Sequence, residues 1–141
     1  MDSKDHIPRD LLHYETVGKE GAPWLVFVHG AGGSIRTWKF QLEYFSKNFR
    51  LLLLDLRDHG FSKNIQPEYK AYDFDIVACD IIKVIDHLIP NVTGMGLRDA
   101  LYILENHGLR VRFKGHGKVR SQSPTYGTPF EKGTIITLEL N

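Results

Sequence analysis

Three short apolar runs in the first part of the chain have the length of β-strands. They are Leu11–Val17, Trp24–His29 and Arg50–Leu56. The last two are nearly continuous in apolar residues, a pattern that favours strands buried on both faces of a parallel sheet. The second run ends in a glycine-rich loop, Gly30–Gly33, where side chains would restrict the backbone.

Helical spacing of apolar residues marks two segments around these strands. One covers residues 34–45, with Ser34 or Thr37 as its N-cap, and the other is Asp73–Leu88. Cys79, the chain's single cysteine, falls within the second pattern and is expected to fill the core. The strand–helix–strand–helix order predicts a βαβ unit with a right-handed crossover and a parallel sheet.

The pattern changes at Ile89-Pro90, because Pro90 cannot continue a helix. One short amphipathic helix ending before Gly108 follows, and then three short strands, so this part is predicted to be a small α+β module. The strands are Leu109–Phe113, Lys118–Gln122 and Thr134–Leu140. The expected module core is Val92, Leu97, Leu101, Leu104, Val111, Val119, Ile136 and Leu138. We therefore expect two domains, 1–88 and 89–141, with the boundary at 88–90.

Composition limits the classes of protein and site. Hydrophobic residues make up 42% and charged residues 25% of the 141 residues, close to globular averages. No apolar run reaches the roughly 20 residues of a membrane span, and the polar N-terminus shows no signal peptide. Localisation is left open, with the cytoplasm expected if the chain is expressed as it stands. One cysteine excludes an internal disulfide and disfavours a thiolate site, so we expect neither a metal nor a cofactor.

Charge is distributed unevenly along the chain. Residues 1–88 hold 11 Lys/Arg and 13 Asp/Glu, or −2, and residues 89–141 hold 7 and 4, or +3, within totals of 18 and 17. Five cations of the second part lie close together: Arg110, Arg112, Lys114, Lys118 and Arg120. No aromatic platform is interleaved with them, so a solvated strand face is favoured over nucleic-acid binding, and a polyanion surface remains an alternative.

Two loops of the first part carry a chemical signal. Trp24–Ser34 is a strand feeding a glycine loop, and Asp55–Ser62 follows the next strand; together they resemble the α/β-hydrolase family over residues 11–88. The resemblance implies that the first loop supplies one oxyanion-hole amide at Ala31 or its neighbour. Asp58 departs from the family, which usually has glycine there. The loop residues that carry the resemblance are His29, Gly30, Ala31, Gly32 and Asp55, Arg57, His59, Gly60, Ser62.

The nucleophile of that family has no counterpart in this sequence. The family requires a further strand ending in Gly-x-Ser-x-Gly, and no serine of this chain lies in such a turn. His29 and His59 match loop-shaping residues of the family rather than its catalytic base. We therefore assign no catalytic residue and expect no catalysis. The alternative is a carboxylic ester hydrolase with an unrecognised nucleophile.

The second part resembles a PASTA module, closest to that of a bacterial penicillin-binding transpeptidase. The resemblance covers residues 90–141 and rests on Pro90–Met95, the helix that follows, Ser121–Pro124 and Lys132–Thr134. It implies a small helix on a three-stranded sheet that recognises cell-wall glycopeptide or contacts the parent transpeptidase. Residues 90–141 contain none of the transpeptidase signatures Ser-x-x-Lys, Ser-x-Asn and Lys-Thr-Gly.

The two resemblances meet within a residue or two of Leu88, which suggests a recombined or engineered chimera, with a natural chain as the alternative. In the resembled fold, strand Trp24–Val28 lies between Arg50–Leu56 and the missing nucleophile strand. One edge of this apolar strand is therefore expected to be open, a template for pairing with another chain. Either the module's strands cover that edge or the protein self-associates.

Overall fold

The computed structural model describes residues 10–63 and 73–141. The polar N-terminal segment 1–9 and the stretch 64–72 of the expected loop lie outside the described residues. The chain divides into two units, Met1–Val84 and Ile85–Asn141, each with its own sheet. The division falls a few residues before the expected boundary at 88–90.

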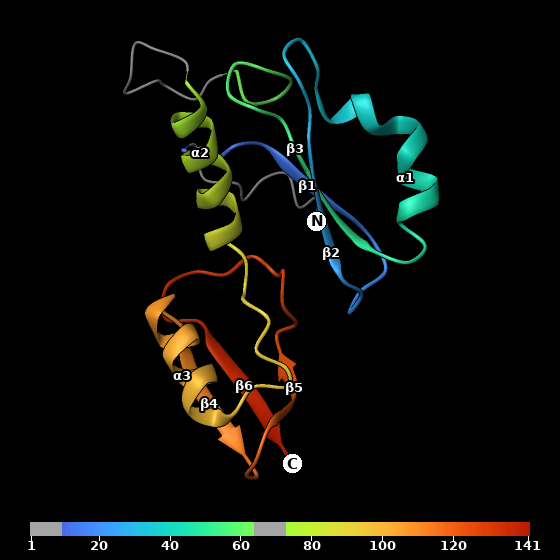
Figure 1. The fold of residues 1–141 in the computed structure, drawn as a ribbon. Helices are drawn as coiled ribbons and strands as arrows, with labels where there is room; N and C mark the ends of the chain where they lie inside the picture. The colour runs from blue at the N-terminus through green and yellow to red at the C-terminus, as the bar shows by residue number, and fades with distance from the viewer. Residues whose placement is uncertain (1–9, 64–72) are drawn as a thin grey trace. The chain divides into compact units, whose positions relative to one another are not determined.

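The first unit is built on a three-stranded sheet of order β1-β3-β2 (Figure 1). Strands β2 (Trp24–Val28) and β3 (Arg50–Leu54) are parallel, as expected for a βαβ unit, while β1 (Tyr14–Gly18) runs antiparallel to β3. The sheet is therefore mixed rather than wholly parallel. The short turn 19–23 between β1 and β2 reverses the chain, whereas a parallel connection needs a crossover of about a dozen residues.

Helices lie on both sides of this sheet, with α1 (Lys39–Phe45) on one side and α2 (Phe74–Asp86) on the other (Figure 1). A 3₁₀ turn, η2 (Ile35–Trp38), leads into α1 (Lys39–Phe45). Both expected capping residues take part at its start, because the Ser34 hydroxyl accepts from the Arg36 amide and the Thr37 hydroxyl accepts from the Ser34 amide. The glycine loop is thereby joined to a capped helical segment.

Only β3 is buried along most of its length, with Leu51–Leu54 at most 2% exposed. The expectation that β2 is buried on both faces is wrong, since Val26 and Val28 are 44% and 43% exposed. On its other face, Phe27 packs edge-on against aromatic rings of η2 and α1. Because β3 is the sole described strand paired with β2, β2 is an edge strand and one of its faces keeps contact with solvent.

Cys79 is another correction, since its side chain is exposed rather than in the core. The inward positions of α2 are Asp80 and Val84, which are four residues apart and share one face of the helix. Cys79 precedes Asp80 by one residue, a rotation of about 100° that turns it toward solvent. The apolar pattern in this helix is wider than the face that its neighbours cover.

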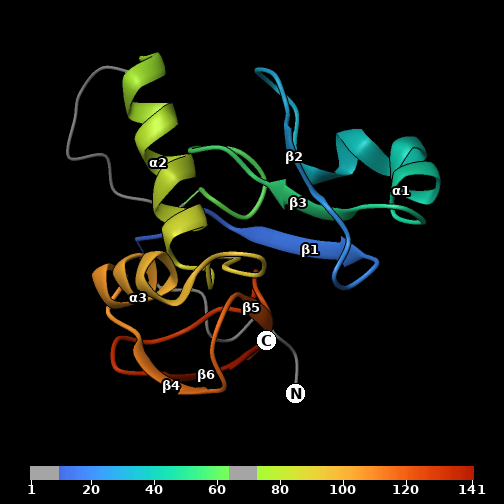
Figure 2. The ribbon, with the colours of Figure 1, turned by 60° about the horizontal axis from the view of Figure 1, so that its bottom comes forward.

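The second unit packs one helix on a separate three-stranded sheet (Figure 2). Helix α3 spans Leu97–Asn106, and the strands are β4 (Arg110–Lys114), β5 (Val119–Ser123) and β6 (Ile135–Leu140). Their order is β4-β6-β5, with β4 parallel and β5 antiparallel to β6. This is the small α+β architecture expected for the module.

Most of the expected module core is present, but Leu101 is absent from it. Leu101 lies on the outer side of α3, one position beyond Ala100, which faces the sheet. Ile89, the first residue of the expected module, also enters the core, and its backbone pairs with Gly127 and Thr128. The buried cluster contains Ile89, Val92, Ala100, Leu104, Leu109, Val119, Ile136, Leu138 and Leu140. The module therefore depends on residues that precede Pro90.

We predict that a fragment of residues 85–141 folds by itself, whereas a fragment of residues 90–141 is less stable. The shorter fragment lacks Ile89 and the bridge between Leu88 and Pro129. Dispersed amide signals in NMR spectra of the longer fragment are the expected result. Leu104→Ala in that fragment should lower the free energy of unfolding by about 2–5 kcal/mol, because Leu104 is fully buried. A collapsed spectrum for residues 85–141 would show that the module depends on the first unit.

Candidate functional site

The two hydrolase-like loops lie side by side because each follows one of two neighbouring parallel strands. His29–Ser34 begins where β2 ends, and Asp55–Ser62 begins where β3 ends. Carboxyl ends of parallel strands share one edge of a sheet, which is where α/β folds place their ligand sites. The fold thus brings together the two loops that carry the family resemblance.

Asp55 is the centre of this cluster. Its side chain is 1% exposed and accepts two backbone hydrogen bonds, from the Ile35 amide at 2.8 Å and the Phe61 amide at 3.0 Å. Ile35 belongs to the start of η2 and Phe61 to the second loop, so one carboxylate connects both loops. A carboxylate that loses water on burial needs such donors, and here backbone amides supply them.

His29 and His59 join the loops in a reciprocal way. The Nε2 atom of His29 accepts from the Leu56 amide, and Nε2 of His59 accepts from the Gly32 amide, each at 3.0 Å. Because both Nε2 atoms accept, the proton of each neutral ring is on Nδ1. The Nδ1 atom of His29 donates to the Gly30 carbonyl, and that of His59 donates to the Arg57 carbonyl. Each histidine therefore binds the backbone of the opposite loop, and their rings lie 5.1 Å apart.

The backbone of the second loop explains its glycine and its unusual aspartate. A Cβ at Gly60 would overlap the Asp55 carboxylate, so position 60 requires glycine. Asp58, where the resembled family usually has glycine, adopts φ +64°, and it is the one non-glycine residue with positive φ in the described part of the chain. Aspartate tolerates this left-handed conformation better than most residues, which is how the loop keeps its path without glycine.

Arg57 is tied to α2 by a buried ion pair. Its Nε and Nη2 atoms donate to the two carboxylate oxygens of Asp80, both at 2.8 Å, and the side chains are 8% and 6% exposed. Such a bidentate pair orients both groups and anchors the second loop to the helix. Arg57 is one of the family-like loop residues, whereas Asp80 was not predicted as a site residue. The available signal was a carboxylate on the otherwise apolar inward face of the helix, four residues before Val84.

The hydroxyl groups near this cluster are engaged in structural contacts. Ser62 is 2% exposed; its Oγ donates to the Asp55 carbonyl at 2.6 Å and accepts from the His13 amide at 2.9 Å. The Ser34 hydroxyl caps η2. No serine in residues 10–63 or 73–141 is hydrogen-bonded to an imidazole, the arrangement that activates a nucleophile.

The amides of the first loop are used unequally. Gly32 donates to His59, Gly33 donates to the Gly30 carbonyl, and Ser34 donates to Thr37. The Ala31 amide donates to no acceptor among the described residues, and Ala31 is exposed. An exposed amide at the end of a parallel strand is available to a negatively charged oxygen.

The geometry of the two loops agrees with a comparison against protein families. The sequence profile described as "Alpha/beta hydrolase family" matches residues 25–101, more than half of the chain. The chain belongs to the alpha/beta hydrolase family. A second profile, "PASTA domain", matches residues 88–141. The resemblances inferred from the sequence to both families are thus confirmed.

The chain covers only part of the length of each curated relative. Epoxide hydrolase 4 of Mus musculus is 32% identical over 77 residues, which is 55% of this chain and 21% of that protein. The (E)-2-((N-methylformamido)methylene)succinate hydrolase of Acinetobacter baylyi is 35% identical over 82 residues, 58% of this chain and 30% of that protein. A 2-succinyl-6-hydroxy-2,4-cyclohexadiene-1-carboxylate synthase of Citrobacter koseri is 45% identical over 49 residues, 35% of this chain and 19% of that protein. The chain thus spans about a fifth to a third of the length of these three relatives.

The two family matches overlap at residues 88–101, and the fold assigns this segment to the PASTA unit. Ile89, Val92 and Ala100 are in the buried cluster of that unit. The chain has therefore changed to the PASTA fold where the alpha/beta hydrolase family continues toward its nucleophile strand. The five cations expected at the module surface, Arg110, Arg112, Lys114, Lys118 and Arg120, are all exposed.

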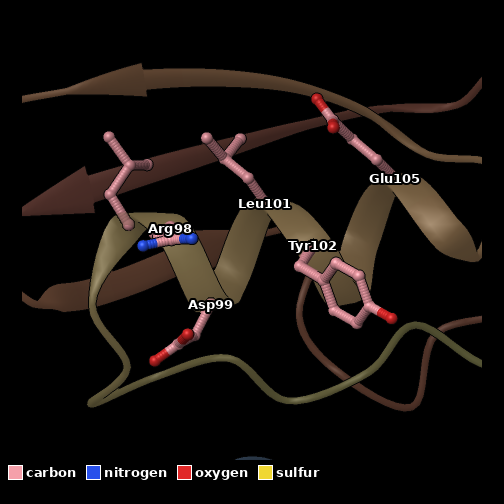
Figure 3. A pocket seen from close by; sticks show the side chains of 6 residues that line it. Arg98, Asp99, Leu101, Tyr102 and Glu105 are labelled. Carbon is pink, nitrogen blue, oxygen red and sulfur yellow. The ribbon is translucent and has the colours of Figure 1, made fainter.

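A shallow pocket lies on the outer side of α3 (Figure 3). Its lining comes entirely from this helix: Leu97, Arg98, Asp99, Leu101, Tyr102 and Glu105. Leu101 is thus a lining residue rather than a core residue. Within residues 10–63 and 73–141, no three histidine, cysteine or acidic side chains are placed to hold a metal ion. Nor does any described helix have the length and apolar character needed to cross a bilayer.

We predict that Asp80→Asn lowers the free energy of unfolding of the first unit by about 3 kcal/mol, because it removes the negative charge that pairs with the buried Arg57. Asp75→Asn, an exposed carboxylate in the same helix, is the control and should change it by less than about 0.5 kcal/mol. Both tryptophans, Trp24 and Trp38, belong to the first unit, so their fluorescence in urea titrations reports on it. Equal effects of the two variants would contradict the structural role of the pair.

Proposed function

We propose that this chain acts by binding rather than by hydrolysis, and that the PASTA module is its binding part. One observation supports this most directly: the groups that could perform chemistry in the hydrolase loops already hold those loops together. Asp55, His29, His59 and Ser62 each make one hydrogen bond to another chain segment and one within their own loop. The PASTA unit, in contrast, has a complete core.

Acyl transfer needs a nucleophile beside a general base, with a place for the developing oxyanion next to both. The exposed Ala31 amide could serve as one oxyanion donor. The second donor of the family comes from the nucleophile elbow, which this sequence lacks. Removing one oxyanion donor costs roughly 10²–10³ in rate, so a remnant with one donor and no nucleophile offers little catalysis. An ester hydrolase with an unrecognised nucleophile is the competing proposal.

The partner that fits the module is cell-wall glycopeptide, with contact to the parent transpeptidase as the alternative. PASTA domains commonly bind peptidoglycan or related cell-wall partners, and the match to this domain, at residues 88–141, includes α3 and all three strands of the second unit. We also infer that the chain arose by recombination or design, because the PASTA match begins inside the hydrolase match. The hydrolase unit then serves as a carrier for the module.

A test of binding against hydrolysis uses the whole chain and two probes. We expect the chain to cosediment with purified peptidoglycan and to remain unlabelled by a fluorophosphonate that reacts with activated serines. The chain heated beyond unfolding is the control for both measurements, and ester turnover should not exceed that control. Stoichiometric labelling would support the hydrolase proposal. Absence of cosedimentation would contradict the binding proposal.

We further propose that the chain self-associates through β2. Among the described strands β2 pairs with β3 alone, so its other edge has backbone donors and acceptors available for another strand. Val26 and Val28 add exposed apolar surface beside this edge. Burying a Val- or Leu-sized side chain contributes about 1.5–3 kcal/mol. A symmetric dimer would bury the same side chains of both protomers.

Val26→Lys should weaken this association about tenfold or more, since it places a charge in the apolar surface. Ile82→Lys is the control: Ile82 is 53% exposed on α2, away from β2, and the substitution adds the same charge. Light scattering across a dilution series measures the association, and circular dichroism checks that both variants fold. A wild-type chain that stays monomeric at every concentration would refute the proposal, as would equal effects of the two lysines.

A further inference from the structure

The PASTA sheet has one face that its own helix does not cover. Residues of β6 alternate along the strand: Ile136, Leu138 and Leu140 are buried, whereas Ile135, Thr137 and Glu139 are exposed. The buried set packs with α3, so the exposed set lies on the opposite face. Strand register extends this open face onto β4 and β5.

Three cations occupy the β4 row of the open face. Arg110, Arg112 and Lys114 pair in register with Ile135, Thr137 and Glu139, and all three are exposed. Alternate residues of a strand are about 6.6 Å apart, so the row spans about 13 Å. No described carboxylate lies within ion-pair distance of these three cations. The row therefore has charge that the module itself does not neutralise.

Two hydroxyl groups lie beside Arg112 in the direction across the strands. Arg112 lies opposite Thr137, and Thr137 lies opposite Ser123, so a guanidinium and two hydroxyls form one line of donors. The next line of residues across the strands contains a carboxylate: Glu139 lies beside Lys114 and accepts a hydrogen bond from the Ser121 hydroxyl at 3.4 Å. Anion binding is thus favoured at the Arg110–Arg112 end and opposed at the Glu139 end.

The chemistry of this face favours carboxylates over a nucleic acid. An arginine fork matches a carboxylate in a bidentate geometry, and hydroxyls add donors beside it. Binding of single-stranded nucleic acid also needs aromatic surfaces on which bases stack. Phe113, the aromatic residue of β4, pairs with Leu138 and belongs to the helix side of the sheet. The open face has no aromatic residue among its described members.

We propose that the open face of the β4-β6-β5 sheet, centred on Arg110 and Arg112, binds the carboxylate groups of a cell-wall glycopeptide. This inference rests on the proposed binding function and assigns it to a surface. The face is the surface of a three-stranded sheet and not a cavity, so it suits a polymer whose carboxylates repeat along the chain rather than a small enclosed molecule. Charge complementarity determines the position of the ligand on the face.

The experiment compares two double variants of the whole chain that remove the same charge. Arg110→Gln with Arg112→Gln changes the open face, while Arg98→Gln with Lys132→Gln removes two exposed cations of the same unit from α3 and from the loop before β6. Binding is measured on immobilised poly-L-glutamate, on peptidoglycan freed of phosphate polymers, and on the same peptidoglycan after amidation of its carboxylates. Poly(U) is the nucleic-acid probe.

We expect the open-face variant to bind poly-L-glutamate and peptidoglycan about tenfold more weakly, and the control to stay within about twofold, since each exposed charge pair contributes modestly. Amidated peptidoglycan should lose binding to the wild type. Thermal unfolding followed by circular dichroism should be similar for all chains, because the replaced side chains are exposed. Should the double variant unfold, Arg112→Gln alone replaces it, with Arg98→Gln as its control.

Three results would overturn the inference: equal losses in both double variants, undiminished binding to amidated peptidoglycan, or tighter binding to poly(U) than to poly-L-glutamate. The failure of the broader proposal looks different. If peptidoglycan is not bound but poly-L-glutamate binding is lost only in the open-face variant, the cell-wall function fails and the carboxylate surface stands. If peptidoglycan is bound equally by both variants, the function stands and the open face is excluded.

Discussion

Backbone amides of two loops must find acceptors when the loops pack together, and this requirement organises the first unit. Asp55 accepts from both sides of the cluster, and His29 and His59 each accept from the opposite loop. Gly60 is needed because the Asp55 carboxylate occupies the space of a side chain there. The most family-like residues of the chain therefore satisfy buried polar groups, a role that persists without any catalysis.

This organisation explains how a hydrolase-like unit remains folded where the nucleophile strand is missing. The loops, η2 and α2 are joined by contacts within residues 10–63 and 73–84, including the buried pair of Arg57 and Asp80. The effect of the missing strand is seen at β2, which pairs with one described strand and has Val26 and Val28 exposed. A family resemblance in these loops is thus evidence for a folding unit, and evidence for the reaction requires the nucleophile as well.

The PASTA unit forms its core from few residues and leaves one face of its sheet uncovered. Its one helix covers one face of the sheet, and the other face has mostly polar and charged side chains beside Ile135. A module of this size has a small core, so Ile89 and the backbone pairs around it extend that core beyond the three strands and the helix. The uncovered face consequently presents the three cations of β4 in register with β6.

Sequence by itself determined the types and order of the elements, the two family resemblances and most of the loop cluster, because periodicity and glycine positions act locally. Tertiary structure decided which faces are buried. It placed Asp80 against Arg57, turned Cys79 and Leu101 toward solvent, and left one face of β2 open. An apolar pattern shows which residues could be buried, but burial depends on whether another strand or helix covers them. For β2 the neighbour that would cover it in the resembled fold is absent from this sequence, a fact that no local pattern in β2 records.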